Sequence, residues 1–306
     1  MTKVFIDGSA GTTGLRIHER LSGRKDIDLI TIPEELRKDI KAREEAINAA
    51  DVAFLCLPDA AAVEAASLVH GSTAVIDTST AHRTHPAWDY GFPELKGRRE
   101  KVASSKRVAN PGCHASGFIS LVEPLVRAGI IPPELKLSCF SLTGYSGGGK
   151  KMIAEYEAPD RSPLLSAPRQ YALGQQHKHL KEMTLISGLE NAPVFCPIVA
   201  DYYSGMEVTV PIFRKDVKGD ISAISEVYRE YYSSGLVHFE ADDPEGGLLS
   251  GAALSGRDDM EIRVAGCDER ILLISRFDNL GKGASGAAIQ NMNLILGLDE
   301  KTGLVI

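Results

Sequence analysis

Apolar and polar positions along the first third of the chain follow a repeating strand-and-helix pattern. Short apolar runs are typical of buried strands, and amphipathic stretches between them have helical spacing. The expected strands are residues 3–6, 27–32, 51–57, 73–76 and 107–109, and the expected helices are residues 15–21 and 60–69, the second capped by Asp59. Strands that alternate with helices predict a parallel sheet with helices on both faces.

The pattern changes after residue 113. An apolar helix is expected at 114–128, followed by long strand-like runs with alternating polarity and a further helix at 222–232. These strands are residues 135–143, 206–213, 261–264 and 270–277. They predict a mostly antiparallel sheet with one face covered. The small-residue segment 279–298 predicts a helix after a glycine turn, and we expect this helix to return to the first domain.

We therefore expect an α/β plus α+β protein of two domains. Residues 1–113 and 284–306 would form a Rossmann-type domain, and residues 114–283 would form a domain built on the mainly antiparallel sheet. A length of 306 residues suits two domains of ordinary size.

Charge and cysteine content exclude several classes of protein. The net charge of −7, from 41 acidic and 34 basic residues, argues against a nucleic-acid binder but allows a local basic pocket for a small anion. The chain opens directly into a strand pattern, and no apolar run approaches the roughly 20 residues of a membrane span. Five cysteines with no CxxC pair indicate a reducing compartment, so we expect a cytoplasmic protein without a zinc site or disulfides.

A glycine loop joins the first strand to the first helix. It reads Gly8-Ser9-Ala10-Gly11-Thr12-Thr13-Gly14. Strand, glycine loop and helix form the setting of a dinucleotide-binding turn, in which the backbone approaches the pyrophosphate at the helix N-terminus. The spacing is GxxGxxG rather than GxGxxG, so a plain strand-to-helix turn is the alternative.

Basic residues follow the second expected strand, where an NAD-specific fold usually places an acid for the ribose hydroxyl. The strand ends in Ile32-Pro33, and the cations beyond it are Arg37, Lys38, Lys41 and Arg43. They favour NADP, whose 2′-phosphate would find positive charge there. The same residues equally suit the solvated face of a helix.

Cys113 follows a Pro-Gly turn and precedes the apolar helix. A thiol at a helix N-terminus is close to the backbone N–H groups and the helix dipole, which favour the thiolate nucleophile. The strand at 107–109 would deliver it to the sheet edge where the loops 7–14, 57–59 and 77–83 converge. The other cysteines have structural interpretations: Cys56, Cys139 and Cys196 suit strands or core, and Cys267 suits a turn.

Three further motifs could bind anions or move protons. The loop Tyr145 to Lys151 combines three glycines with Lys150 and Lys151, which suits an anion cradle and equally a flexible hairpin end with solvated lysines. Arg83 lies past a strand end, where it would hold a phosphate or carboxylate or form a surface ion pair. His177 and His179 would share a face if extended, and one would then serve as acid/base for a thiolate. A metal site is the alternative, but no third ligand has convincing spacing.

Together these parts indicate one reaction class. A thiolate, a histidine, a nicotinamide-dinucleotide fold and an anion site suit an oxidoreductase acting on acyl phosphates or aldehydes. The thiolate attacks the acyl phosphate, phosphate leaves, and the resulting thioester is reduced to an aldehyde by NADPH. A histidine would supply the proton of the intermediate's oxygen.

With these residues located, the chain resembles the type-2 N-acetyl-γ-glutamyl-phosphate reductase family, within the aspartate-semialdehyde dehydrogenase-like group. The matching motifs span nearly the whole chain in order: 8–14, Asp77-Thr78-Ser79-Thr80-Ala81-His82-Arg83, Asn110-Pro111-Gly112-Cys113, 144–150, His177-Lys178-His179-Leu180 and 278–298. The resemblance implies NADPH-dependent reduction of N-acetyl-γ-glutamyl phosphate to the 5-semialdehyde and phosphate in arginine biosynthesis. The alternatives are a related reductase for another acyl phosphate, such as aspartyl phosphate, and a non-catalytic NADP-binding paralogue.

The resemblance also implies roles for individual residues. Cys113 would be the nucleophile, and His177 or His179 the acid/base. NADP would contact Gly8, Ser9, Ala10, Gly11, Thr12, Thr13, Gly14, Ser79, Gly147, Gly148 and Asn279. Substrate would contact Arg83, Asn110, Lys150 and Glu182. One departure is Lys181, where similar sequences usually carry proline, so the backbone course after His179 stays open. The family further implies a homodimer or homotetramer.

Overall fold

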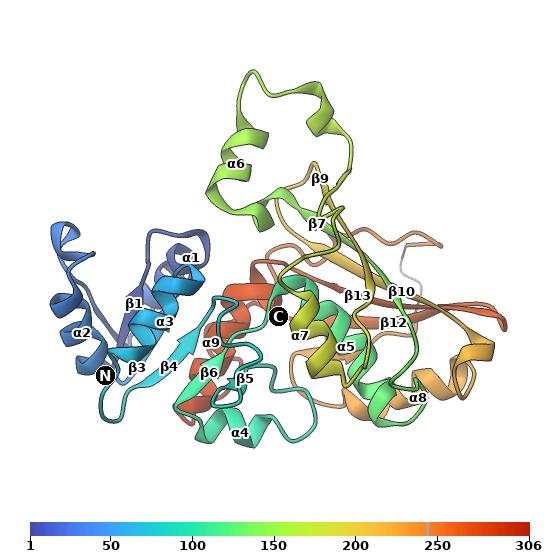
Figure 1. Cartoon of the computed structure of the whole chain (residues 1–306), viewed down its shortest axis with the longest axis horizontal. Helices are drawn as coiled ribbons and strands as arrows, with labels where there is room; N and C mark the ends of the chain where they lie inside the picture. Colours follow the sequence, from blue (N-terminus) through green and yellow to red (C-terminus); the bar gives the residue numbers. More distant parts are fainter. Residues whose placement is uncertain (243–244) are drawn as a thin grey trace. The chain divides into compact units, whose positions relative to one another are not determined.

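The computed structural model describes residues 1–242 and 245–306, which form two compact units (Figure 1). Unit 1 comprises Met1–Pro93, Gly97–Pro111 and Ala284–Leu304, and unit 2 comprises Glu94–Lys96, Gly112–Gly283 and Val305–Ile306. Within the described residues, the strands form one sheet of six strands in unit 1 and one of seven in unit 2. Across these same residues, no helix combines the length and the apolar character needed to cross a membrane.

The sheet of unit 1 is parallel, with strand order β2-β1-β3-β4-β6-β5. Its strands are β1 (Thr2–Asp7), β2 (Ile27–Ile30), β3 (Val52–Leu55), β4 (Ala74–Asp77), β5 (Asp89–Tyr90) and β6 (Arg107–Ala109). Its helices are α1 (Thr12–Ser22), α2 (Ile40–Ala49), α3 (Asp59–Ser67), α4 (Arg99–Ser104) and α9 (Gly286–Ile295). The strand-helix alternation read from the sequence is therefore confirmed.

Helices cover both faces of this sheet because successive strand residues point to opposite sides. Val4 of β1 packs in a core with Ile17 of α1 and Ile289 of α9. Phe5, the next residue, packs in a second core with Ile47 of α2. The C-terminal helix α9, red in Figure 1, thus completes the core of unit 1 although most of unit 2 separates it from β6 in the sequence.

The cap predicted for α3 is wrong. The helix begins at Asp59 itself, with Pro58 at the N-cap position. The Asp59 carboxylate instead accepts hydrogen bonds from the Thr80 backbone N–H at 2.9 Å and the Thr80 hydroxyl at 2.5 Å. The loop after β4, which contains Thr80, lies next to the loop after β3 at the sheet edge. The Asp59 carboxylate therefore bonds donors of this neighbouring loop.

The sheet of unit 2 has strand order β11-β12-β13-β10-β7-β9-β8. Its strands are β7 (Ser138–Gly144), β8 (Arg169–Gln170), β9 (Val194–Ala200), β10 (Met206–Phe213), β11 (Val237–Phe239), β12 (Met260–Gly266) and β13 (Arg270–Phe277). The β7–β9 and β11–β12 pairs are parallel, and the other pairs are antiparallel. The predicted fold class, a Rossmann-like domain with a second, mainly antiparallel domain, is confirmed.

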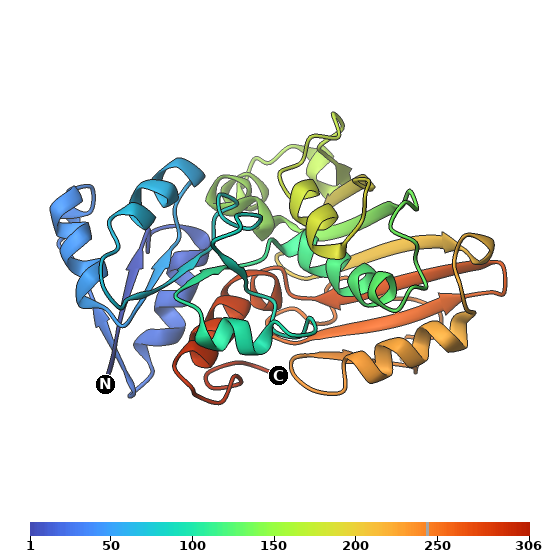
Figure 2. The same cartoon turned by 60° about the horizontal axis from the view of Figure 1, so that its bottom comes forward.

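Helices α5 (Cys113–Arg127) and α8 (Ile221–Tyr231) pack on one face of the unit 2 sheet. Figure 2 shows α8, in orange, running alongside the sheet, where it contacts β11 and β12. At Gly117 of α5 an added Cβ would lie 2.4 Å from a Val208 side-chain carbon, so the glycine permits close contact between helix and sheet. The hydroxyl of Tyr228 in α8 donates to the carbonyl of Leu121 in α5, which joins the two helices.

Candidate active site

Helix α5 begins at Cys113, with Gly112 as its N-cap residue. Glycine offers no side-chain oxygen to the first-turn N–H groups, so these groups and the helix dipole remain directed at the thiol and its surroundings. The thiol residue is half-buried. The Gly112 N–H donates to Glu182 Oε2 at 3.2 Å, and Glu182 is almost fully buried. This hydrogen bond fixes the turn in front of the thiol.

The other cysteines have different surroundings. Burial raises the pKa of Cys56, just after β3, to about 12, and also raises the pKa of Cys139 in β7. Both thiols are therefore protonated and poor nucleophiles near neutral pH. Cys196 lies in β9, and exposed Cys267 lies in the turn between β12 and β13. Cys113 differs from all four because it opens a helix.

His177 and His179 are not in an extended segment, the condition under which they would share a face. They occupy a turn before α7 (Leu180–Ser187), and the His179 backbone N–H donates to His177 Nδ1 at 3.2 Å. This turn nevertheless brings the rings together, with centroids 4.7 Å apart and planes at 86°. Lys181 is the second residue of α7, so the helix forms here without the proline that similar sequences carry.

Glu182 connects the histidine turn to the thiol turn. Its Oε1 lies 3.9 Å from His179 Nε2, and its Oε2 accepts the Gly112 N–H. Both Glu182 and His179 are buried. The structure therefore brings together three of the predicted elements: the turn before Cys113, one histidine and the acid of the histidine motif.

His114 and Tyr171 belong to the same cluster but were missed by the sequence analysis. His114 Nδ1 lies 2.6 Å from Ser141 Oγ, and His114 Nε2 lies 2.7 Å from the Tyr171 hydroxyl. The His114 ring centroid is 5.7 Å from those of both His177 and His179. The available signal was the position of His114 beside the thiol.

Burial sets the charge state of this cluster. It lowers the pKa of His114 to about 3, with a smaller contribution from His177, so His114 is neutral. Burial also raises the pKa of Tyr171, and the negative charge of a Cys113 thiolate raises it further. The cluster therefore contains a neutral imidazole and a neutral phenol that senses the thiolate.

The glycine loop of unit 1 needs its glycines. Gly8 has φ +86°, and a Cβ there would lie 2.3 Å from the Cys56 carbonyl oxygen. A Cβ at Gly14 would lie 2.4 Å from the Gly8 carbonyl oxygen. The loop follows β1, where the strand order reverses between β1 and β3, the place at which open α/β sheets bind ligands.

A cavity of about 180 Å³ adjoins this loop. Its lining includes Gly8, Ser9, Ala10, the residues that follow β2, and Arg37. Of the basic residues considered for a 2′-phosphate, Arg43 is unsuitable: it is buried and ion-paired with Asp7 at 2.9 Å and Glu64 at 3.1 Å. Arg37 is the member of that set that lines the cavity.

The Asp77–Arg83 loop is held by internal hydrogen bonds. The Ser79 hydroxyl donates to Asp77 at 2.7 Å. Arg83 is buried rather than on the surface, and its guanidinium donates to the Asn110 and Thr78 carbonyl oxygens at 2.9 and 3.0 Å. The side chain of Asn110, also buried, donates to the Ala284 carbonyl at 3.0 Å.

The glycine-lysine loop of unit 2 is helical rather than a flexible hairpin end. A 3₁₀ turn (Tyr145–Gly148) leads into α6 (Gly149–Glu157), and exposed Lys150 lies in the first turn of that helix. Buried Asn279 donates to the Ser146 hydroxyl at 3.0 Å, and its Oδ1 accepts the Gly205 N–H at 2.9 Å. Asn279 thus lies beside Gly147 and Gly148, the other residues of unit 2 predicted to contact the cofactor.

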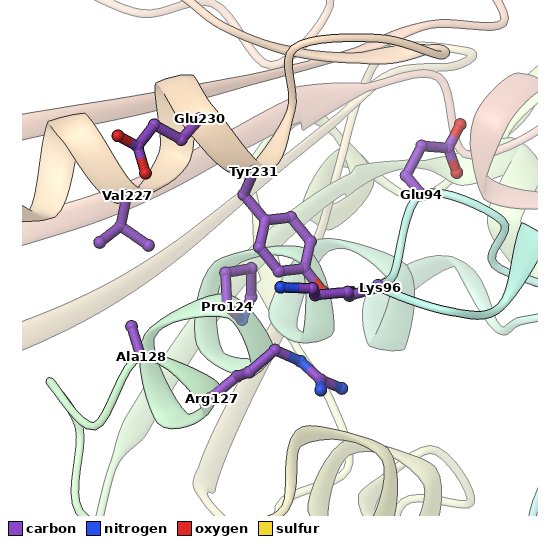
Figure 3. A pocket seen from close by; sticks show the side chains of 8 residues that line it. All are labelled: Glu94, Lys96, Pro124, Arg127, Ala128, Val227, Glu230 and Tyr231. Atoms are coloured by element: carbon purple, nitrogen blue, oxygen red, sulfur yellow. Dashed lines mark hydrogen bonds between the residues drawn. The ribbon is translucent and has the colours of Figure 1, made fainter.

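A larger cavity of about 490 Å³ lies at the other end of α5 (Figure 3). Lys96 and Arg127 lie there near the hydroxyl of Tyr231. Helix α5 rises about 1.5 Å per residue over its 15 residues, so this cavity is roughly 20 Å from Cys113. It is separate from the thiol cluster.

Among residues 1–242 and 245–306, no three His, Cys, Asp or Glu side chains are grouped to hold a metal ion.

Comparison with known proteins identifies the class. Residues 3–105 match the semialdehyde dehydrogenase NAD-binding domain, and residues 113–279 match the semialdehyde dehydrogenase dimerisation domain. The fold is that of aspartate semialdehyde dehydrogenase II from Vibrio cholerae, with TM-score 0.72 at 16% identity over 97% of this chain and 99% of that one. The enzyme from Candida albicans, solved with NADP, gives TM-score 0.65 at 14% identity over 97% and 99%. Fold and site thus define an oxidoreductase of the semialdehyde dehydrogenase class.

Closer relatives define the family. Proteins named N-acetyl-γ-glutamyl-phosphate reductase from Brucella ovis and Brucella canis are 44% identical, with 96% of this chain and 99% of each relative covered. The chain belongs to the N-acetyl-γ-glutamyl-phosphate reductase family. The predicted family and enzyme class are therefore confirmed, and the aspartyl-phosphate alternative is not favoured.

Proposed function

We propose that this protein reduces N-acetyl-L-glutamyl 5-phosphate to N-acetyl-L-glutamate 5-semialdehyde and phosphate, with NADPH, in arginine biosynthesis. The observation that carries the proposal is the placement of Cys113 at the start of α5 beside the Glu182–His179 pair. It supports a thiolate with an oriented acid/base partner, in a chain 44% identical to proteins named for this reaction.

The residues of unit 1 fit a dinucleotide. Gly8 and Gly14 keep the loop after β1 free of side chains, and the adjoining cavity would take the adenosine end, with Arg37 on the 2′-phosphate. We assign the remaining contacts to Ser9, Ala10, Gly11, Thr12, Thr13, Ser79, Gly147, Gly148 and Asn279. NADPH bound there supplies the hydride that reduces the acyl group.

In the first step, the Cys113 thiolate attacks the acyl carbon. A bond forms between the Cys113 sulfur and the acyl carbon. The bond between the acyl carbon and the phosphate oxygen breaks, and phosphate leaves with the bonding electrons. The first-turn N–H groups of α5 stabilise both the thiolate and the oxygen that becomes negative in the tetrahedral intermediate. The product is a thioester on Cys113.

In the second step, the thioester is reduced to a hemithioacetal. The hemithioacetal then breaks down to the aldehyde and the free thiolate. We assign His179 as the residue that moves the proton of the hemithioacetal oxygen, because Glu182 orients it and stabilises its charged form. When that hydroxyl loses its proton to His179, the C–S bond breaks and the thiolate returns. His177 Nδ1 accepts the backbone N–H of His179 and so stabilises the turn that carries the His179 ring.

We assign the substrate's anionic groups to Arg83 and Lys150, with Asn110 and Glu182 completing the substrate contacts. A guanidinium can bind a carboxylate or a phosphate through two hydrogen bonds, and exposed Lys150 lies in the first turn of α6, where the helix dipole also favours an anion.

Residues 1–113 and 284–306 would serve as the cofactor domain and residues 114–283 as the catalytic and oligomerisation domain. The reactive thiol suits the reducing cytoplasm, where we place the protein.

We also propose that unit 2 mediates homodimer or homotetramer formation through the sheet face opposite α5. Phe140 of β7 is 43% exposed, and Leu272 of β13, paired with Pro211 of β10, is 37% exposed. An apolar surface across neighbouring strands costs free energy in water and is typical of an interface. Two copies of this face would cover one another in an isologous contact.

The reverse reaction tests the proposed function. Purified protein is given N-acetylglutamate 5-semialdehyde, phosphate and NADP⁺, and NADPH is followed by absorbance. We expect phosphate-dependent NADPH formation that Cys113→Ala abolishes and Cys139→Ala preserves. Absence of phosphate-dependent turnover would refute the proposal, and faster turnover of aspartate semialdehyde would reassign the substrate.

A further inference from the structure

A chain of three hydrogen-bonding groups lies beside the nucleophile and has no role in the mechanism above. It runs from the Ser141 hydroxyl in β7 through the His114 ring to the Tyr171 hydroxyl, with distances of 2.6 and 2.7 Å. Ser141 is fully buried and His114 is 4% exposed. Because His114 directly follows Cys113, the chain is anchored to the first turn of α5.

The direction of these hydrogen bonds follows from the buried serine. Within residues 1–242 and 245–306, the Ser141 hydroxyl has one hydrogen-bond partner, His114 Nδ1. If Ser141 accepted a proton from Nδ1, its own buried O–H would have no acceptor, which costs roughly 1–3 kcal/mol. Ser141 therefore donates to Nδ1.

The state of His114 then fixes the state of Tyr171. Burial holds the pKa of His114 at about 3, so the ring is neutral and carries one N–H. With Nδ1 accepting from Ser141, that N–H is at Nε2 and donates to the Tyr171 oxygen. The Tyr171 O–H is consequently directed to another acceptor, since its bond to His114 uses an oxygen lone pair.

The position of Tyr171 indicates what that acceptor is. Its ring centroid is 6.1 Å from those of both His114 and His177, and the charge of a Cys113 thiolate raises its pKa. Tyr171 is hydrogen-bonded to the ring of His114, the residue directly after Cys113, so its hydroxyl belongs to the side chains gathered at the first turn of α5, where the reacting carbon would bond to the sulfur. The carbonyl oxygen of that carbon becomes negative in each tetrahedral intermediate and needs donors.

We propose that Tyr171 is a catalytic residue that donates a hydrogen bond to the reacting carbonyl oxygen on Cys113, and that Ser141 and His114 are positioning residues that keep its hydroxyl in the donating orientation. No bond to hydrogen is broken at Tyr171: the raised pKa keeps the phenol neutral while it stabilises the oxyanion. Tyr171 thus complements the N–H groups of α5, and proton transfer stays with His179. The inference rests on acyl transfer to Cys113 in the proposed function.

Two reagents separate an oxyanion donor from a residue that activates the thiol. Iodoacetamide alkylates a thiolate without a carbonyl addition step, whereas p-nitrophenyl acetate acylates it through a tetrahedral oxyanion. In Tyr171→Phe we expect acylation of Cys113 to slow by about 10²–10³-fold, the cost of losing one such donor. Alkylation by iodoacetamide should keep the wild-type rate. Equal losses with both reagents, or no loss of acylation, would overturn the inference.

Variants of the positioning chain provide the matched controls. Ser141→Ala removes the hydroxyl that donates to His114 Nδ1. The Tyr171 O–H can then donate to His114 instead, so acylation of Cys113 should slow while alkylation keeps its rate. Ser141→Thr restores a hydroxyl and should restore the acylation rate. Tyr228→Phe removes another buried phenol, bonded to Leu121, and should lower only the melting temperature. Acylation at the wild-type rate in the Ser141→Ala variant would contradict the positioning role.

The two proposals fail separately. If the wild type shows no reductase turnover but Tyr171→Phe slows acylation selectively, the proposed function is wrong and the role of Tyr171 stands. If turnover is present and Tyr171→Phe acylates normally, the role of Tyr171 is wrong and the proposed function stands.

Discussion

The Glu182 carboxylate lies 3.9 Å from His179 Nε2, and both side chains are buried. The same carboxylate accepts the Gly112 N–H at 3.2 Å, next to Cys113. One acidic side chain thus contacts both the histidine and the turn in front of Cys113. Groups that orient a reacting residue in this way commonly contribute one or two orders of magnitude to the rate.

Replacement of Glu182 by Gln keeps the shape of the side chain and removes its charge. We expect kcat to fall by about 10–100-fold, as for other groups that orient a reacting residue. Stopped-flow rates of the variant and the wild type at one pH would measure the fall. A wild-type kcat in Glu182→Gln would show that the carboxylate does not orient the acid/base.

His114 should make folding stability depend on pH. An unfolded histidine binds a proton near pH 6.5, whereas the pKa of His114 in the fold is about 3, so between these values the unfolded chain holds the extra proton. Stability therefore falls as pH decreases from about 6.5, by about 1.4 kcal/mol per pH unit from this residue. Urea unfolding at about pH 4, 5 and 6 should show a smaller slope in His114→Asn by this amount. Parallel slopes in the two proteins would contradict the neutral buried imidazole.

Arg37 should determine cofactor preference. It lines the cavity next to the glycine loop, whereas Arg43 is held by Asp7 and Glu64. Arg37→Ala should raise the KM for NADPH by about 10-fold or more, since a charged hydrogen bond contributes about 1.5–3 kcal/mol. The KM for NADH should stay unchanged. Lys25→Ala, on the loop between α1 and β2, is the control for loss of a surface cation. A parallel rise for both cofactors would place Arg37 away from the 2′-phosphate.

Leu272 should be needed for assembly. Its partly exposed side chain lies opposite Pro211 on the uncovered sheet face, where an aspartate would bury an unpaired charge in an interface. Leu272→Asp should dissociate the oligomer to monomers in light scattering coupled to size-exclusion chromatography. Leu164→Asp, at a position 75% exposed outside the sheets, should leave the mass unchanged. An unchanged mass for Leu272→Asp would exclude this face as the interface.

Much of the architecture was readable from local pattern. The apolar run of Val4, Phe5 and Ile6 determines a strand buried on both faces, and glycines at 8 and 14 are required wherever a backbone must approach another so closely. The Pro-Gly turn before Cys113 likewise determines a helix start at that residue. These features depend on residues close in sequence, so spacing alone predicts them.

The partners of buried polar groups were decided only by the tertiary structure. Arg43 pairs with Asp7 and Glu64, and His114 meets Tyr171 across 57 positions of the chain. Every such group needs a partner when it leaves water, and which one it obtains depends on how elements distant in sequence pack together. The sequence by itself thus determined the sheets, the family and the position of Cys113 at a helix start, whereas the hydrogen-bonded surroundings of Cys113 required the fold.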